Sequence, residues 1–269
     1  MARLRDHELE AGTVAHYEDP AYYTKTYKGR VEDVRYYVDL AEHAGGPVLE
    51  HGCGNGRITI PMARSGATVV GVDRSAPMLA DLRARLREEP DDVSARVTVR
   101  RGDMRLFRAG RRFPLVICPF NAFLHLYERA DVERFLARTR AHLTRRGELC
   151  FDISVPDPAE HARDPARAYF APRFRYPRED GTPGPMIRYS ERFDYDRSRQ
   201  ILFVAMEFSP AEGEPWMTPL AHRQFYPREL EALLHYNGFT ITEQYGDFFR
   251  SPLASGSHTM VVHCRARST

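Results

Sequence analysis

The segment 47–56, with the sequence PVLEHGCGNG, limits the possible folds of this chain more than any other segment. Residues 48–51 form a short run typical of a buried strand, and this run leads directly into a glycine-rich turn. A helical pattern of apolar residues follows at once. Gly52, Gly54 and Gly56 lack a Cβ atom, so they can adopt positive φ angles and let a ligand approach the backbone. We therefore expect a strand–turn–helix unit whose first helical N–H groups face a ligand.

The spacing of the glycines separates two kinds of nucleotide site. A dinucleotide fingerprint requires the pattern G-x-G-x-x-G, but Arg57 occupies the position of the third glycine. The segment instead reads Glu50-x-Gly52-x-Gly54-x-Gly56. This spacing argues against a dinucleotide-dependent oxidoreductase.

Two further segments place acidic residues where strands are expected to end. Residues 69–73, VVGVD, form an apolar strand pattern that ends in Asp73, 21 residues after the first glycine of the turn. A carboxylate that binds ribose is expected at that distance. Residues 97–104, VTVRRGDM, form a third strand pattern that is followed by Asp103. In this order, the three signals resemble the motifs of class I S-adenosylmethionine-dependent methyltransferases of the small-molecule type, over about residues 48–154.

The resemblance implies a set of contacts to S-adenosylmethionine, which the three glycines of the turn would approach with their backbone. Glu50 is implied to lie near the methionyl amine, directly or through water, and Asp73 to bind both ribose hydroxyls. Asp103 and Met104 are implied to contact the adenine amine and ring, and Arg74 to lie along the adenine. The alternatives are ordinary turn acids at Glu50 and Asp103 and a solvated arginine at position 74.

The segment 119–126, PFNAFLHL, follows the expected fourth strand, 113–118. Ligands of parallel sheets bind at the carboxyl ends of strands. In the family this loop lies between cofactor and substrate, which makes Pro119 and Asn121 candidate cofactor contacts. His125 is a candidate general base because the pKa of a free histidine lies near neutrality. A packed or solvent-facing helix histidine is the alternative.

The segment 21–30 is rich in tyrosine and leads into an expected amphipathic helix at 31–43. Two interpretations stay open. The tyrosines either pack the N-terminal segment on the sheet or form a cap over the methionine end of the cofactor. In the second case Tyr27 is a candidate catalytic and cofactor-binding residue, and Arg30 is a candidate cofactor-binding residue. We expect residues 1–46 to form a helical cap or arm.

Strand and helix patterns alternate from residue 47 to residue 154 and predict an α/β fold. The expected architecture is a Rossmann-like, doubly wound, mostly parallel sheet of seven strands. Residues 226–269 complete this core with a helix and an antiparallel edge hairpin.

The alternation stops after residue 154. Residues 155–184 contain six prolines and predict an irregular segment. Three strand patterns without intervening helices follow, at 186–195, 200–209 and 217–225. We therefore predict that residues 155–225 form a small inserted antiparallel sheet, which serves as a lid or as a dimerisation surface.

The end of the third inserted strand carries the second group of candidate site residues. His222 is a candidate catalytic residue, and Arg223 and Tyr226 are candidate substrate contacts. Because side chains alternate along a strand, at most one of His222 and Arg223 faces a pocket directly. Trp216, the single tryptophan, is either a pocket wall or an anchor of the insertion.

The charge and the cysteine content indicate the cellular compartment of the protein and the classes of partner that it can bind. The chain has 39 basic and 37 acidic side chains and a formal net charge of +2, which gives no overall attraction to nucleic acid or to an anionic membrane. No C-x-x-C pair is present, which favours free buried thiols in a reducing compartment. No signal peptide, 18-residue apolar run or H-x-x-x-H pattern occurs, so we expect a cytoplasmic protein without a metal site.

These observations predict transfer of a methyl group from S-adenosyl-L-methionine to a nitrogen or oxygen of a small-molecule acceptor. The reaction is an in-line displacement that releases S-adenosyl-L-homocysteine, so the enzyme mainly aligns the reactants and excludes water. Two alternatives stay open: a methyltransferase that acts on RNA or protein, and a non-catalytic cofactor-binding protein with the same fold. The acceptor is not fixed by the sequence, and a homodimer is possible.

Overall fold

The computed structural model describes residues 2–178, 180 and 182–267. The chain divides into two compact units. The small unit consists of Met1–Gly29 and Asp157–Gln224, and the large unit consists of Arg30–Pro156 and Phe225–Thr269. The segment 1–46, expected as one N-terminal cap or arm, is therefore divided between the two units. The role of the insertion as a lid or a dimerisation surface stays a prediction.

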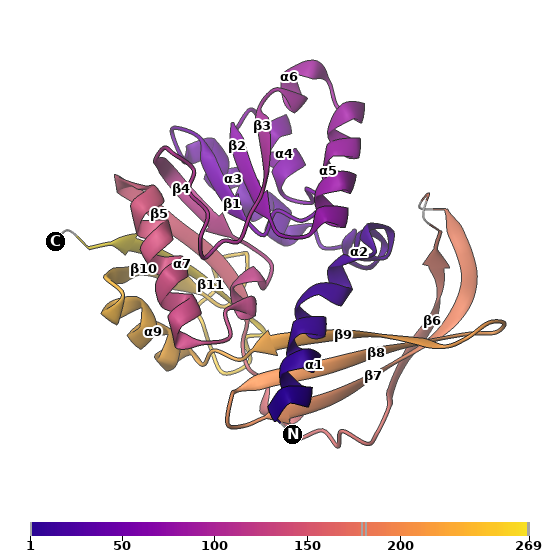
Figure 1. Ribbon diagram of the computed structural model, residues 1–269. Helices are drawn as coiled ribbons and strands as arrows, with labels where there is room; N and C mark the ends of the chain where they lie inside the picture. Colours follow the sequence, from indigo (N-terminus) through magenta and orange to yellow (C-terminus); the bar gives the residue numbers. More distant parts are fainter. Residues whose placement is uncertain (1, 179, 181, 268–269) are drawn as a thin grey trace. The chain divides into compact units, whose positions relative to one another are not determined.

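Within the described residues, the large unit contains a seven-stranded sheet with the order β10-β11-β5-β4-β1-β2-β3 (Figure 1). Strands β1 to β5 are parallel to one another, whereas β11 is antiparallel to β5 and to β10. This arrangement confirms the predicted fold class, including the edge hairpin. The strands are β1 (Val48–His51), β2 (Val69–Asp73), β3 (Val97–Arg101), β4 (Phe113–Cys118), β5 (Leu143–Ser154), β10 (Phe239–Tyr245) and β11 (Thr259–Ala266).

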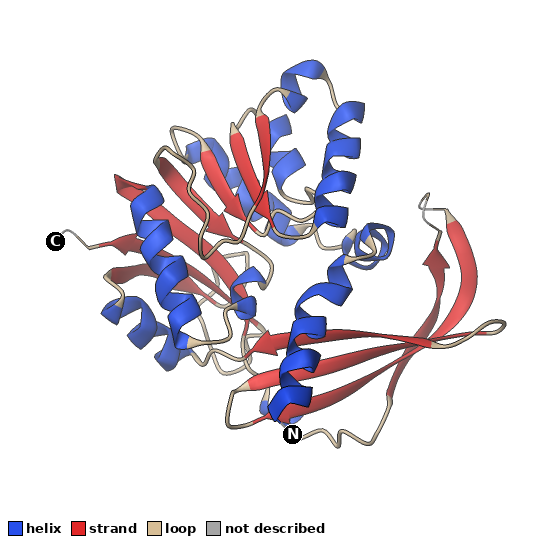
Figure 2. Cartoon of the chain, in the orientation of Figure 1, coloured by secondary structure: helices blue, strands red, loops and turns tan. Residues whose placement is uncertain are grey.

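Helices cover both faces of this sheet (Figure 2). Apolar side chains of α7 and α9 belong to one buried cluster, and those of α3 and α4 belong to another. The doubly wound core is therefore two apolar layers separated by the sheet. The helices of the large unit are α3 (Glu32–His43), α4 (Thr59–Arg64), α5 (Ala76–Glu88), α6 (Asp91–Ser94), the short 3₁₀ helix η2 (Ala122–His125), α7 (Arg129–His142) and α9 (Pro227–Tyr236).

Local sequence signals set the start of α5. The Ser75 hydroxyl accepts a hydrogen bond from the Met78 N–H at 3.3 Å, and Pro77 lies in the first turn. Leu79 and Leu82 then point into the core and are fully buried. The helix continues to Glu88.

The small unit contains a second sheet. Within the described residues it has four antiparallel strands in the order β6-β7-β8-β9, which confirms the predicted insertion. Helix α1 packs on β9, where a Cβ atom at Gly12 would lie 2.8 Å from the Ala221 Cβ. The elements are α1 (Ala2–Val14), the 3₁₀ helix η1 (Ala15–Tyr17), α2 (Pro20–Tyr27), α8 (Pro158–His161), β6 (Tyr169–Pro177), β7 (Pro183–Asp196), β8 (Ile201–Pro210) and β9 (Trp216–Arg223).

The prediction of an irregular segment at 155–184 is wrong for β6. Proline content suggested a break, but β6 is an edge strand, and one side of an edge strand does not need N–H donors. Pro172 lies where the pairing with β7 shifts register, between Ala171 and Phe174. Pro177 is the last residue of the strand. The prolines therefore occupy the positions that a strand tolerates.

The glycine turn provides a test of the packing between β1 and α5. A Cβ atom at Gly56 would lie 2.3 Å from the Leu82 Cδ1, and the φ angle there is +87°. At Gly66 the φ angle is +103°, but no atom lies within 4 Å of a Cβ. Gly56→Ala adds a steric clash to the cost of the φ angle, so it should lower the free energy of unfolding more than Gly66→Ala does, by roughly 1–3 kcal/mol.

Urea unfolding of both alanine variants beside the wild type measures this difference. Equal losses for Gly56→Ala and Gly66→Ala would mean that the space beside Leu82 does not require a glycine.

Candidate active site

The carboxyl ends of four neighbouring strands lie side by side at one end of the large sheet, which is called the cofactor edge below. In the order β4-β1-β2-β3, Glu50 of β1 pairs with Ile117 of β4 and with Gly71 of β2. Asp73 of β2 pairs with Arg101 of β3. The structure therefore gathers most of the expected cofactor contacts at one edge. These residues are Glu50, Gly52, Gly54, Gly56, Asp73, Arg74, Asp103, Met104, Pro119 and Asn121.

The Asp73 carboxylate holds the glycine turn in place. Its Oδ2 accepts a hydrogen bond from the Gly54 N–H at 2.8 Å, and its Oδ1 accepts one from the Ser75 N–H at 2.8 Å. Burial raises the pKa of Asp73, although these N–H groups act in the opposite direction. The Arg74 N–H is a third backbone donor to this carboxylate. A carboxylate offers about four acceptor positions, so Asp73 retains about one position for a hydroxyl donor.

Glu50 is a buried carboxyl group beside the same turn. Its Oε2 accepts a hydrogen bond from the Thr59 hydroxyl at 2.5 Å. Burial raises the pKa of Glu50 to about 8, while the Thr59 hydrogen bond and the charge of Arg57 act to lower it. A positively charged group placed nearby would favour the ionised form. The site is therefore electrostatically suited to a cation.

Arg57 links the glycine turn to the segment before α3. Its guanidinium donates two hydrogen bonds to the buried Asp33 carboxylate, at 2.9 and 2.5 Å. It also donates to the Arg30 carbonyl at 3.2 Å. The guanidinium carbons of Arg57 and Arg30 lie 4.6 and 4.8 Å from the centre of the Phe120 ring. Arg30 therefore lies beside the turn that follows β4.

That turn is conformationally unusual. Phe120 and Asn121 have φ angles of 53° and 63°, a region that costs non-glycine residues about 1–3 kcal/mol each. The Phe120 N–H donates to the Asp152 Oδ1 at 2.8 Å, and the Ser154 N–H donates to the Asn121 Oδ1 at 2.7 Å. Side chains of β5 and of the turn itself thus stabilise the strained backbone.

Five residues of this site were not identified from the sequence. Asp152 had the clearest signal, because it interrupts the apolar run of β5 at a position where an unpaired acid would be costly. Arg57 was considered only as a departure from the dinucleotide pattern. The missed residues are Asp33, Arg57, Thr59, Phe120 and Asp152.

The expected adenine contacts are only partly available. Arg105 binds the Asp103 carboxylate through its Nε at 2.9 Å and its Nη2 at 2.6 Å, and it also donates to Asp131 at 2.7 Å. The pKa of Asp103 is lowered because this pairing outweighs partial burial. Met104 packs partly buried against the core, whereas the Arg74 side chain is exposed.

The candidate residues His125 and Tyr226 also belong to the large unit. His125 is the last residue of η2, and its Nδ1 lies 2.9 Å from the Tyr127 hydroxyl. Tyr226 precedes α9, and its N–H donates to the Glu229 carboxylate at 3.4 Å. A catalytic role for His125 and a substrate contact for Tyr226 stay predictions.

The remaining candidates belong to the small unit. The Tyr27 hydroxyl lies 3.0 Å from the His16 Nε2, and burial lowers the pKa of His16 to about 4. Trp216 stacks on Phe208 with 5.2 Å between the ring centres, which anchors it in the inserted sheet. The Arg223 guanidinium donates to the carbonyl of the next residue at 2.5 Å. The roles predicted for Tyr27, Trp216, His222 and Arg223 stay predictions.

Within residues 2–178, 180 and 182–267, no helix combines the length and the apolar character needed to cross a bilayer. In the same residues, no three or more histidine, cysteine, aspartate or glutamate side chains are grouped so that they could hold a metal ion.

Glu50→Gln tests the burial of the carboxyl group. The pKa of Glu50 is about 8 in the folded protein and 4.5 in its ordinary state, so the folded state binds the proton more tightly. The resulting stabilisation is complete below the lower pKa and is lost as the pH rises through the higher one. Between about pH 5 and about pH 8.5, Glu50→Gln should therefore lose less unfolding free energy than the wild type, by on the order of a few kcal/mol.

Urea unfolding across this pH range provides the measurement, and Glu42→Gln, at an exposed position of α3, is the control. If Glu50→Gln and the wild type show parallel pH dependences, the carboxyl group is not buried as described.

Comparison with known proteins gives an independent view of this site. Residues 48–147 match a family model described as a methyltransferase domain. The dTDP-3-amino-3,6-dideoxy-alpha-D-glucopyranose N,N-dimethyltransferase of Streptomyces fradiae is 36% identical to the chain over 119 residues. This match covers 44% of the chain and 44% of the relative, so the chain spans less than half of the relative's length.

Solved methyltransferase structures share the fold over most of the chain. The CcbJ methyltransferase from Streptomyces caelestis has a TM-score of 0.76 at 23% identity, covering 95% of this chain and 99% of its own. CalS10 from Micromonospora echinaspora, an amino pentose methyltransferase solved with S-adenosylmethionine, has a TM-score of 0.64 at 21% identity. That similarity covers 90% of this chain and 95% of CalS10.

The domain match includes the three strand-end motifs at Gly52–Gly56, Asp73 and Asp103. The solved structures add the same overall fold. Together they support the resemblance drawn from the sequence: residues 48–147 match a methyltransferase domain, and most of the chain has the fold of solved S-adenosylmethionine-dependent methyltransferases.

Proposed function

We propose that the protein transfers a methyl group from S-adenosyl-L-methionine to a small-molecule acceptor and releases S-adenosyl-L-homocysteine. The observation that carries this proposal is the glycine turn, whose Gly54 N–H is fixed by the partly buried Asp73 carboxylate. Such a turn lets the backbone approach a nucleoside, and Asp73 has about one unused acceptor position for a ribose hydroxyl. The methyl group is attached to a positively charged sulfur, so its transfer is a displacement that mainly requires alignment.

The residues at the sheet edge suit this cofactor. Glu50 provides a carboxyl group for the methionyl amine, and the cation would favour its ionised form. Arg30 and Asn121 lie at or beside the turn after β4, which supports both as candidate cofactor contacts. The cofactor supplies the electrophilic methyl group, and the protein supplies orientation and exclusion of water.

We further propose that the acceptor is an amine on a sugar-like small molecule. The Streptomyces fradiae relative is named as an N,N-dimethyltransferase of an amino sugar nucleotide, and CalS10 as an amino pentose methyltransferase. An ammonium ion must lose a proton before it attacks the methyl group. His125, His222 and Tyr27 are the candidates for this proton transfer, and Trp216, Arg223 and Tyr226 are the candidate acceptor contacts. An oxygen acceptor is the variant of this proposal that the same site also permits.

The location and partners are part of the proposal. The four cysteines are buried and free, which supports a reducing compartment such as the cytoplasm. The net charge of +2 gives little support to a nucleic-acid substrate. A homodimer is compatible with the inserted sheet.

The proposal is tested with S-adenosylmethionine that carries an isotopically labelled methyl group. The purified protein is incubated with this cofactor and with amino sugars or a fractionated host extract, and mass spectrometry locates the label. We expect label on a small amine. Label on RNA or protein would overturn the proposed acceptor class, and cofactor binding without any transfer to these acceptors would overturn the proposed activity.

Asp73→Ala tests the cofactor site. This substitution removes the ribose acceptor and releases the Gly54 N–H, so the affinity for S-adenosylhomocysteine should fall at least about a hundredfold. Isothermal titration calorimetry gives the affinity, and circular dichroism verifies the fold. Asp92→Ala, which removes an exposed acid paired with Arg96, serves as the control. Unchanged affinity in a folded Asp73→Ala variant would contradict the assignment.

A further inference from the structure

Asp152 is a buried acid that the proposed cofactor contacts do not include. It lies on β5, and only 2% of its surface is exposed. Its Oδ1 accepts two hydrogen bonds, from the Phe120 N–H at 2.8 Å and from the Tyr37 hydroxyl at 2.7 Å. Its backbone carbonyl accepts a third, from the Asn121 N–H at 3.2 Å. Three contacts of one residue therefore converge on the turn after β4 and on α3.

The turn needs these contacts because its backbone conformation is unfavourable without them. Phe120 and Asn121 both adopt left-handed φ angles, which non-glycine residues rarely keep without external contacts. The same turn lies directly against the glycine turn, since a Cβ atom at Gly52 would be 2.7 Å from the Ala122 Cβ. A displacement of this turn would therefore also displace the glycine turn, where the expected cofactor contacts lie.

Helix α3 connects to the turn at two points. The Tyr37 hydroxyl donates to Asp152, and Asp33, one turn earlier on α3, binds Arg57. Arg57 in turn packs over the Phe120 ring. Helix α3 therefore contacts the Phe120 ring through Arg57 and the backbone of the turn through Asp152.

We propose that Asp152 and Tyr37 form a positioning pair that holds the turn 119–122 in its left-handed conformation and thereby sets the cofactor affinity. This inference rests on the proposed function, because the cofactor is the ligand that the turn would contact. Neither side chain needs to touch the cofactor. Tyr37 fixes the carboxylate, and the carboxylate fixes the Phe120 N–H.

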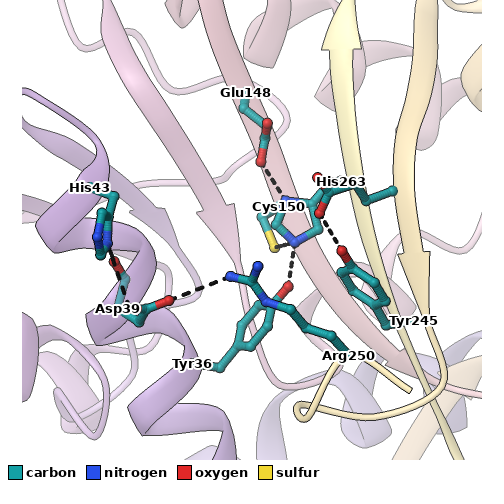
Figure 3. Close-up of polar contacts among 9 residues, drawn as sticks. Tyr36, Asp39, His43, Glu148, Cys150, Tyr245, Arg250 and His263 are labelled. Carbon is teal, nitrogen blue, oxygen red and sulfur yellow. Dashed lines mark hydrogen bonds and ion pairs between the residues drawn. The ribbon is translucent and has the colours of Figure 1, made fainter. Parts of the chain in front are cut away.

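The adjacent residue Tyr36 offers a matched control. Figure 3 shows its hydroxyl directed at the His263 ring, with an oxygen–Nε2 distance of 2.5 Å, and His263 also binds Glu148. Tyr36 is buried on the same helix and also bonds to the sheet, but its partner lies on β11 and not at the turn. Loss of either tyrosine hydroxyl removes a buried hydrogen bond between α3 and the sheet, but only the Tyr37 hydroxyl binds the carboxylate that holds the turn.

The experiment compares Asp152→Ala, Asp152→Asn, Tyr37→Phe and Tyr36→Phe in the full chain. Calorimetry measures the dissociation constant for S-adenosylhomocysteine, and hydrogen exchange with mass spectrometry follows the amides of 119–126 in the unliganded protein. Asp152→Ala should weaken binding by roughly ten- to a hundredfold, because it removes a charged acceptor. Asp152→Asn keeps an acceptor and should restore part of the affinity, and Tyr37→Phe should weaken binding by about three- to tenfold.

Tyr36→Phe should leave the affinity and the exchange of 119–126 at the wild-type level, whereas the other three variants should accelerate that exchange. If Asp152→Ala does not fold, Asp152→Asn and Tyr37→Phe still test the proposal. The proposal is overturned if Tyr37→Phe and Asp152→Asn behave like Tyr36→Phe in both measurements. If the wild type does not bind S-adenosylhomocysteine, the proposed function is overturned instead. The exchange measurement would still test whether Asp152 and Tyr37 stabilise the conformation of the turn.

Discussion

The hydrogen bonds of the Asp73 carboxylate connect three elements that the rest of the site depends on. One oxygen binds the Gly54 N–H in the turn after β1, and the other binds the Ser75 N–H at the start of α5. Ser75 caps α5, and Leu82 of that helix fills the space beside Gly56. A single partly buried side chain thus links the end of β2, the shape of the glycine turn and the placement of α5. The turn then limits where a ligand can approach.

Buried acidic groups dominate the electrostatics at this edge of the sheet. Burial raises the pKa of Glu50 to about 8 and that of Asp152 to about 6, and it also raises the pKa of Asp73. The positive charge of Arg57 acts in the opposite direction and lowers the pKa of Glu50 and of Asp152. A ligand with a positively charged sulfur and amine would further favour the ionised form of these acidic groups. The energetic cost of burying acids without a cation is therefore consistent with a site built for S-adenosylmethionine.

The sequence predicted the core well because each signal there is local. Glycine spacing and strand ends with acids both act within a few residues. The prediction missed β6, because proline content cannot reveal that a strand lies at a sheet edge. It also missed Asp152 and Arg57, whose partners Phe120 and Asp33 are more than twenty residues away along the chain. Contacts of that kind become visible only when the strands are placed side by side.

The measurement that tests the central claim most directly is a crystal structure of the complex with S-adenosylhomocysteine. We predict that the ribose hydroxyls bind the Asp73 carboxylate and that the methionyl amine lies beside Glu50. The Gly54 N–H should keep its hydrogen bond to Asp73, because that bond shapes the turn. A ligand bound away from the carboxyl ends of β1 and β2, with Glu50 and Asp73 bonded only to protein groups, would contradict the account.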